Sequence, residues 1–186
     1  MEVAVLVTEI KIEQLFSIEN HIDELSELII QIVEEGASIG FLPPMKQLDA
    51  NKYWESVLNP DVILLVAKSN NQIVGSVQLH LSGKQNGSHR AEIGKLMTHP
   101  NFRRNGIGRL LMQEAEVNAI QENKSLLILD TREGDPSNKL YTSLGYIQAG
   151  RIPTYAKSAN GELAATIFYY KELNQSDYNN QRFQNE

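Results

Sequence analysis

The segment that most constrains this chain is Arg-Arg-Asn-Gly-Ile-Gly-Arg at residues 103–109, between an apolar stretch and an amphipathic one. Glycine has no Cβ, so successive backbone N–H groups in such a turn can approach an anion closely. A helix that begins there adds unpaired first-turn donors and the positive end of its dipole. Guanidinium groups also suit phosphate geometry. The segment therefore predicts a turn that binds a pyrophosphate.

Two common nucleotide-binding patterns do not explain this turn. A P-loop requires Gly-Lys-Ser or Gly-Lys-Thr, and the chain contains neither. A dinucleotide-binding fold requires a third glycine and a position near the first strand, whereas this segment lies in the middle of the chain. An ordinary glycine-containing helix start remains the alternative on these residues alone.

The turn and its neighbours resemble the GNAT acyltransferases. The pattern Arg-x-x-Gly-x-Gly at residues 103–108 is similar to the acetyl-CoA-binding turn of that family. Residues 91–100 resemble its central strand with a proline stop, and residues 127–131 resemble the next strand. Asn-Lys-Leu-Tyr-Thr-Ser-Leu-Gly-Tyr at 138–146 resembles its second signature. These pieces follow the family's order and spacing, and the resemblance covers roughly residues 3–173.

Four shorter segments are similar to one subgroup, the tabtoxin-resistance acetyltransferases. They are residues 36–41, 90–97, 129–131 and 152–155. This narrower resemblance implies an acceptor that is a small, amine-bearing molecule.

Hydrophobic periodicity predicts an α/β fold (α+β in some schemes) with a mixed sheet and helices on both faces. The predicted strands cover residues 3–8, 62–67, 73–81, 92–98, 126–130, 146–151 and 163–171. The predicted helices cover residues 18–35, 48–58, 106–121 and 137–144. The resemblance adds that the sheet is mostly antiparallel and that its central strand splays from its neighbour. A chain of 186 residues predicts one GNAT domain over 1–173, followed by a polar, disordered tail over 174–186.

Composition narrows the chemistry. The chain has no cysteine, which excludes disulfides, a cysteine nucleophile and a thiolate zinc site. The four histidines (His21, His80, His89 and His99) show no paired metal spacing, so no metal is expected. No apolar run approaches the ~20 residues of a membrane span, and the N-terminus lacks a signal-peptide pattern. These features predict a cytoplasmic protein that does not bind membranes.

The net charge of −6 bears on partners. Proteins that bind nucleic acid usually present a basic face, whereas the densest arginine cluster here is confined to the glycine turn. A local basic pocket on an acidic body fits a small polyphosphate ligand, and we expect no nucleic-acid partner. The acidic remainder favours an amine-bearing acceptor.

The family resemblance implies acyl transfer from acetyl-CoA to an amine, without a covalent enzyme intermediate. Such a reaction needs an acceptor for the amine proton, a donor to the oxyanion, and an acid for the thiolate. Tyr141 is the candidate acid, because its family counterpart protonates the leaving thiolate; the alternative is that its ring packs against the cosubstrate. Glu92 and Asp130 are alternative candidate bases, and each could instead be structural, Glu92 facing solvent and Asp130 capping a turn.

The predicted contacts of acetyl-CoA come from three segments. In the family, the main chain of the splayed strand pairs with the pantetheine amides and supplies an oxyanion donor. The complete set of predicted cosubstrate contacts is Leu96, Met97, Thr98, Arg103, Arg104, Asn105, Gly106, Ile107, Gly108, Arg109, Asn138 and Tyr141.

The acceptor pocket is predicted to be bordered by Phe41, Tyr53, Trp54 and Tyr155, although helical spacing favours a core position for Trp54. The sequence thus predicts a monomeric or homodimeric N-acetyltransferase that acts on a small amine. A protein N-acetyltransferase and a non-catalytic CoA-binding regulatory module are the alternatives.

Overall fold

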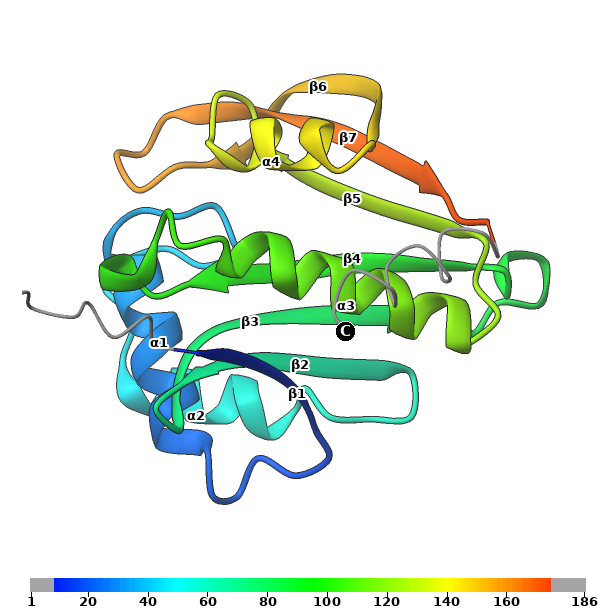
Figure 1. Ribbon diagram of the computed structural model, residues 1–186. Coiled ribbons are helices and arrows are strands. Elements are labelled where there is room, and N and C mark those ends of the chain that lie inside the picture. The colour runs from blue at the N-terminus through cyan, green and yellow to red at the C-terminus, as the bar shows by residue number, and fades with distance from the viewer. Residues whose placement is uncertain (1–8, 175–186) are drawn as a thin grey trace, which may run out of the picture.

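The computed structural model describes residues 9–174 as a seven-stranded sheet with four α-helices (Figure 1). The strands are β1 (Ile10–Leu15), β2 (Val62–Ser69), β3 (Gln72–Leu81), β4 (Arg90–Thr98), β5 (Leu126–Arg132), β6 (Ile147–Lys157) and β7 (Leu163–Glu172). The α-helices are α1 (Ile22–Glu34), α2 (Gln47–Glu55), α3 (Ile107–Gln121) and α4 (Ser137–Ser143). The sheet order is β1-β2-β3-β4-β5-β7-β6, and only β4 and β5 are parallel neighbours. The predicted fold class is confirmed.

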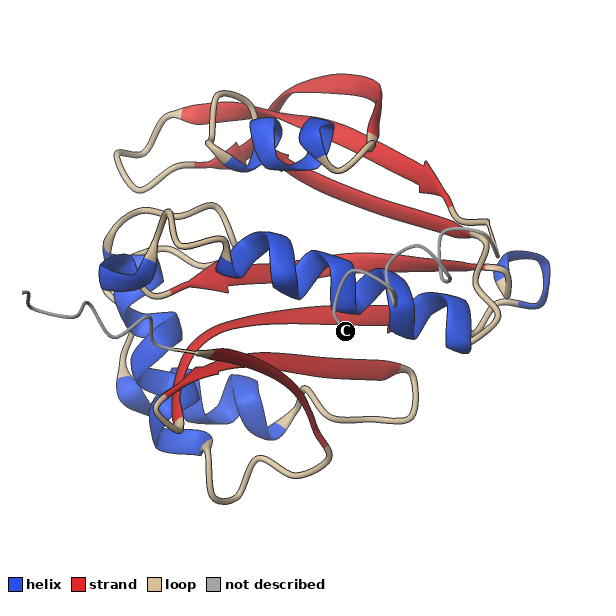
Figure 2. Cartoon of the chain, viewed as in Figure 1, coloured by secondary structure: helices blue, strands red, loops and turns tan. Residues whose placement is uncertain are grey.

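Two hydrophobic cores lie on opposite faces of this sheet. Strand β2 contributes to both, because it is apolar at nearly every position. Ile63 and Leu65 point into the core shared with α3, whereas Leu64 and Val66 point into the core shared with α1 and α2. Alternation along a strand places successive side chains on opposite faces. Figure 2 shows the helices distributed on both sides of the strands. In the rest of the text, these are called the α3 face and the α1 face.

Most predicted elements are confirmed, with differences at their ends. The helix predicted from residue 18 begins at Ile22, because a turn that brings the Ile18 carbonyl to the His21 amide precedes it. The helix predicted over 48–58 ends at Glu55. The last hairpin is longer than predicted, since a bulge between Ile152 and Ala156 carries β6 past the proline at 153.

Two predictions fall on the chain ends. The strand predicted over 3–8 and the tail predicted over 174–186 lie outside the described residues, apart from Asn174. The first described strand, Ile10–Leu15, was not predicted as a strand. It pairs antiparallel with β2 and forms the edge of the sheet.

The central opening of the sheet lies between β4 and β5. These strands pair only at Arg90, Ala91 and Glu92, opposite residues 126–128. Figure 1 shows the two strands close together at their N-terminal ends and diverging towards their C-terminal ends. The predicted splay of the central strand is therefore confirmed, and residues 93–98 of β4 do not pair with β5.

A buried ion pair also joins the two halves of the sheet. The Lys171 ammonium on β7 donates to Glu116 on α3 at 2.8 Å and to the Leu144 carbonyl at 2.9 Å. Glu116 is 1% exposed and Lys171 17% exposed at the side chain. Removal of one partner from such a pair leaves a buried charge without compensation. The pair thus joins the two halves of the sheet on the α3 face at the end where β4 and β5 still pair, since Lys171 lies opposite Leu127 and Leu127 lies opposite Ala91.

Gly75 on β3 allows α3 to pack directly on the sheet. A Cβ at this position would come within 2.8 Å of the Met97 carbonyl oxygen, 3.0 Å of Ile107 and 3.2 Å of Leu111. We predict that Gly75→Ala lowers the free energy of unfolding by about 1–3 kcal/mol through overpacking, measured by urea denaturation. Gly150→Ala on β6 is the matched control, because its Cβ would meet nothing within 4 Å. Equal stabilities of the two variants would contradict this account of the packing.

Candidate active site

The predicted pyrophosphate turn connects β4 to α3 at the wide end of the opening. Gly106 has a φ of +79° and precedes the first residue of the helix, Ile107, whose side chain is buried. A Cβ on Gly106 would meet nothing within 4 Å, so space above the turn is open. A Cβ on Gly108 would meet Leu140 of α4 at 3.3 Å and Thr98 of β4 at 4.0 Å. The turn, the end of β4 and α4 therefore converge.

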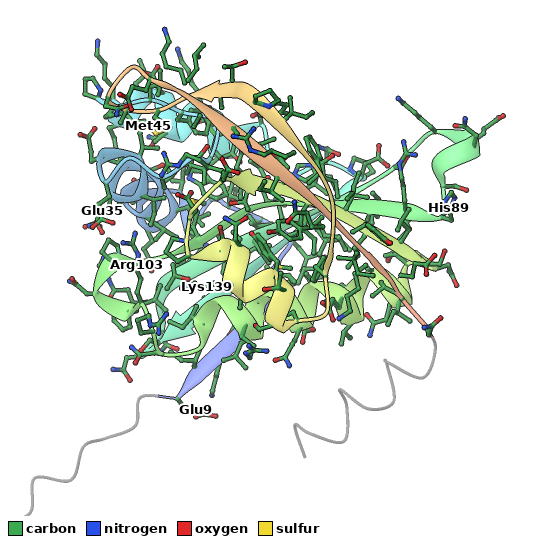
Figure 3. The ribbon with its side chains drawn as sticks, turned by 90° about the horizontal axis from the view of Figure 1, so that it is seen from above. Glu9, Glu35, Met45, His89, Arg103 and Lys139 are labelled. Carbon is green, nitrogen blue, oxygen red and sulfur yellow. The ribbon has the colours of Figure 1, made fainter. Side chains whose placement is uncertain are left out.

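The arginines of this turn attach it to neighbouring helices. Arg103 forms an ion pair with Glu35 at the end of α1 (Figure 3). Arg109 donates to the Ser143 hydroxyl at 2.7 Å, at the end of α4. Arg104 has a φ of +67°, and its side chain is exposed, as are those of Arg103, Asn105 and Arg109. The turn thus presents exposed cations around a glycine with open space above it.

The main chain of Leu96, Met97 and Thr98 lies along the opened part of β4. Met97 and Thr98 pair with Ser76 and Gly75 of β3, so this side of the strand is occupied. On the other side no pairing with β5 continues beyond Glu92. An unpaired strand edge offers N–H and C=O groups to an extended partner. The position that sequence analysis assigned to an extended ligand is therefore an open strand edge.

Tyr141 enters the opening from the α3 face. It is 5% exposed and packs against Tyr146 and Tyr169, with ring centroids 6.0 and 5.9 Å away. Burial raises the pKa of the Tyr141 phenol, and the nearby carboxylates of Asp130 and Asp135 raise it further. The phenol is therefore protonated at neutral pH, as a proton donor must be.

Asn138, a predicted cosubstrate contact, has its side chain engaged within the protein. Its amide nitrogen donates to the carbonyls of Arg132 at 2.8 Å and Asp135 at 2.9 Å. Its amide oxygen accepts a hydrogen bond from the Tyr169 hydroxyl at 2.9 Å. These contacts fix the start of α4, and with it Tyr141, against β5 and β7. The side chain of Asn138 thus orients this helix.

The two candidate bases lie on the opposite face of the sheet from Tyr141. Ala91 and Ile93 point into the core on the α3 face, so Glu92 between them points to the α1 face. Leu127 and Leu129 on β5 also point into that core, so Asp130, the next residue, points to the α1 face. Both side chains are exposed.

Asp130 is not the cap of a turn but one half of a cross-strand contact. Its Oδ2 lies 2.9 Å from the Thr166 hydroxyl of β7 and accepts a hydrogen bond from it. Thr166 is 3% exposed, so one oxygen of the carboxylate is held in place from the buried side. The rest of the carboxylate faces the opening, where it interacts electrostatically with Tyr141 and Lys95.

Lys95 is a residue of the site that sequence analysis missed. It lies in a bulge of β4 with a φ of +53°, a conformation that is uncommon outside glycine. Its ammonium donates to the Ile39 carbonyl at 2.6 Å and lies 5.4 Å from the centre of the Phe41 ring. Burial lowers the pKa of this ammonium, and Asp130 and Glu92 oppose that shift. Lys95 therefore contacts the loop after α1 and interacts electrostatically with Asp130 and Glu92.

Arg132, also missed, holds the same loop from β5. It donates to the Gly36 carbonyl at 3.1 Å and pairs with Asp135 at 2.9 Å. Together, Lys95 and Arg132 attach residues 36–39 to the two diverging strands. A cavity of about 230 Å³ lies between this loop, Arg132 and the β6–β7 hairpin at 156–159. The loop thus forms one wall of a pocket beside the opening.

Three of the four aromatic residues predicted to border the acceptor pocket lie beside the opening. Phe41 packs edge-on against Tyr53, with ring centroids 5.0 Å apart. Trp54 is 0% exposed and belongs to the core of the α1 face, as its spacing favoured. Tyr155 is 50% exposed and packs against Phe168 on the other side of the opening. Phe41 and Tyr53 therefore border the site from one side, and Tyr155 from the other.

Two negative findings concern the described residues 9–174. They contain no group of three or more His, Cys, Asp or Glu side chains that could hold a metal ion. None of the helices within this range is long and apolar enough to cross a membrane.

Comparison with known proteins agrees with this geometry. The sequence pattern of the acetyltransferase (GNAT) family matches residues 23–146. An uncharacterized N-acetyltransferase from the hisH–hisA intergenic region of Azospirillum brasilense is 27% identical over 130 residues, which are 68% of this chain and 77% of that protein.

Solved structures share the fold at low sequence identity. A ribosomal-protein-alanine N-acetyltransferase from Brucella melitensis superposes with a TM-score of 0.76 at 22% identity, over 88% of this chain and 99% of that one. The yncA protein of Salmonella typhimurium, solved with its cofactor acetyl-CoA, has a TM-score of 0.76 at 16% identity, over 90% of this chain and 96% of that one.

We predict that Lys95→Met loosens the loop after α1. The Ala37 amide donates to the Ile32 carbonyl of α1, and the Ile39 amide donates to the Ala37 carbonyl. Their hydrogen exchange should become roughly tenfold faster when a charge-assisted bond to the loop is lost. Hydrogen exchange with mass spectrometry measures this. Lys124→Met is the matched control, because Lys124 also donates to a carbonyl, that of Ser88, at 2.7 Å. Unchanged exchange in Lys95→Met would show that the loop is held by other contacts.

Proposed function

Since the chain belongs to the GNAT acetyltransferase family, we propose that it transfers the acetyl group of acetyl-CoA to a primary amine of a small molecule. The observation that carries this proposal is the convergence of three features at the opening of the sheet. An unpaired edge of β4, a glycine turn at the start of α3 and the protonated phenol of Tyr141 meet at the same end. Family membership supports an acyltransferase; the acceptor and the roles of single residues are our inference.

The glycine turn and the strand edge suit the two parts of CoA. Backbone amides from Arg104 to Gly108 and the N-terminus of α3 would hold the pyrophosphate, with the exposed arginines as counter-charges. The main chain of residues 96–98 would pair with the amides of pantetheine. The acetyl-CoA in the yncA structure supports this choice of cosubstrate. In this arrangement the thioester would lie between β4 and β5.

The reaction then requires that the amine nitrogen lose a proton and that the thiolate sulfur gain one. The amine nitrogen attacks the thioester carbonyl carbon, the carbon–sulfur bond breaks, and the nitrogen loses a proton to a carboxylate. Tyr141 gives its phenolic proton to the sulfur and is later reprotonated from solvent. Glu92 and Asp130 are both placed on the α1 face for the first proton, and either fits the role of the base.

The surroundings favour a small acceptor. The pocket of about 230 Å³ beside the opening is walled by the loop at 36–43 and by the β6–β7 hairpin. Walls on both sides suit a compact molecule better than a protein chain. The carboxylates and the net charge of −6 suit an amine. The resemblance to the tabtoxin-resistance subgroup points the same way, and we propose it as the nearest functional relative.

Of the two alternative functions, one has specific support. The Brucella melitensis neighbour is a ribosomal-protein-alanine N-acetyltransferase, which supports a protein N-terminus as acceptor. A CoA-binding regulatory module would keep the turn but would not need a phenol of raised pKa close to a carboxylate. A loss of turnover in Tyr141→Phe at unchanged CoA affinity would favour the enzyme over the regulatory module.

The first test of this proposal concerns the cosubstrate. Gly106→Trp should block the backbone approach of a pyrophosphate, so we predict at least about a tenfold loss of CoA affinity by calorimetry. Gly161→Trp is the matched control, because Gly161 also has a positive φ, +88°, and open space at its Cβ. Equal CoA affinity in the two folded variants would remove the turn from the binding site.

The second test concerns Tyr141. The parent protein should release CoA with at least one amine of a panel that contains small amines and N-terminal peptides. Tyr141→Phe should then lower kcat on the order of 10²–10⁴-fold while the affinity for CoA stays nearly constant. Tyr170→Phe on β7 serves as the control tyrosine. Full activity in Tyr141→Phe would mean that the thiolate leaves without this acid.

A further inference from the structure

His80 is a histidine whose place in the site could not be read from the sequence. It lies on β3 directly opposite Glu92 of β4 in the strand pairing. Opposite residues of an antiparallel pair project to the same face, so the imidazole and the carboxylate share the α1 face. The ring lies over Gly94, whose Cβ would be 3.5 Å from His80 Nε2. The imidazole is thus next to the candidate base and half-buried.

Gln78 fixes which ring nitrogen carries the proton. Gln78 is 1% exposed, and its amide nitrogen donates to the Tyr53 hydroxyl at 2.7 Å. Its amide oxygen therefore faces His80 Nε2, at 3.1 Å. With the Gln78 amide in this orientation its oxygen accepts, so Nε2 carries the hydrogen and Nδ1 has a free lone pair when the ring is neutral. The hydrogen bonds in this array of Tyr53, Gln78 and His80 thus orient the imidazole so that Nδ1 can accept a proton.

Burial favours the neutral form of the ring before reaction. Burial lowers the pKa of His80, and Lys95 lowers it further, while the Glu92 carboxylate opposes both effects. The other titratable group that faces this array is Tyr53 of α2, where burial raises the pKa to about 12, so it carries no charge at neutral pH. A neutral imidazole beside a carboxylate can accept a proton, and the resulting imidazolium forms an ion pair with that carboxylate.

We propose that His80 receives, through Glu92, the proton that leaves the acceptor amine. The proton passes from the amine nitrogen to the Glu92 carboxylate and then, by way of solvent between the two opposed side chains, to His80 Nδ1; it returns to bulk solvent after the product leaves. Because an imidazole holds a proton at higher pH than a carboxylate, the pair is a stronger base than Glu92 alone. This inference rests on the proposed acetyl transfer and assigns the base to Glu92 rather than Asp130.

The pH dependence of turnover tests the proposal. The kcat/KM of the parent should fall at acidic pH with an inflection below ~6.5, the ordinary imidazole pKa, because the pKa of His80 is lowered. His80→Gln should lose this inflection and about 10–100-fold in kcat, with CoA affinity unchanged. Glu92→Gln should show the same loss, and the double variant should add little to it. His89→Gln, at an exposed position (Figure 3), is the control histidine.

Other outcomes overturn the proposal in distinguishable ways. An inflection that persists in His80→Gln and disappears in Asp130→Asn would make Asp130 the base, while the acetyl transfer would stand. No CoA release from the parent with any amine of the panel would overturn the acetyl transfer and the proton path together.

A second measurement needs neither turnover nor a variant that folds. Nitrogen NMR of the histidine rings in the parent protein should show His80 protonated at Nε2, with a pKa below the ordinary imidazole value. A His80 ring protonated at Nδ1 would also overturn the proposal, because the lone pair would then face Gln78.

Discussion

The incomplete parallel pairing of β4 and β5 is the constraint on which the rest of the site depends. Three residue pairs join these strands, and the remainder of β4 keeps main-chain groups that β5 does not reach. Buried backbone groups without partners are costly, so an opening of this kind is stable only where water or a ligand can reach it. The sheet is therefore built around a place for an extended molecule, and the site residues are arranged along its two sides.

Holding the opening at a fixed width requires contacts beyond the strands. On the α3 face, at the closed end of the opening, Lys171 joins β7 to Glu116 of α3 in a buried ion pair. On the α1 face, Lys95 and Arg132 reach the same loop from β4 and from β5. The ion pair joins β7 to helix α3 of the other half of the sheet. Lys95 and Arg132 join β4 and β5 to the loop after α1. These cations thus stabilise the relative positions of the strands and also contribute positive charge around the opening.

The sequence predicted the parts of this structure that depend on local chemistry. Glycine spacing located the turn at Gly106, and periodicity located the helices and most strands. Ile10–Leu15 was missed because its alternating apolar and polar residues are a weaker strand signal than the apolar run before it. Lys95, Arg132 and His80 could not be found in this way. Their roles depend on a bulge, on a loop distant in sequence and on strand register, and none of these has a local pattern.

The positions of the proposed acid and the proposed base follow from the same opening. Tyr141 reaches the gap from the α3 face, whereas Glu92 and His80 lie on the α1 face. Burial raises the pKa of the Tyr141 phenol, and the Asp130 carboxylate adds to that shift. An amine and a thioester bound in the opening would therefore be approached from opposite faces, with the base acting on the nitrogen and the acid on the sulfur.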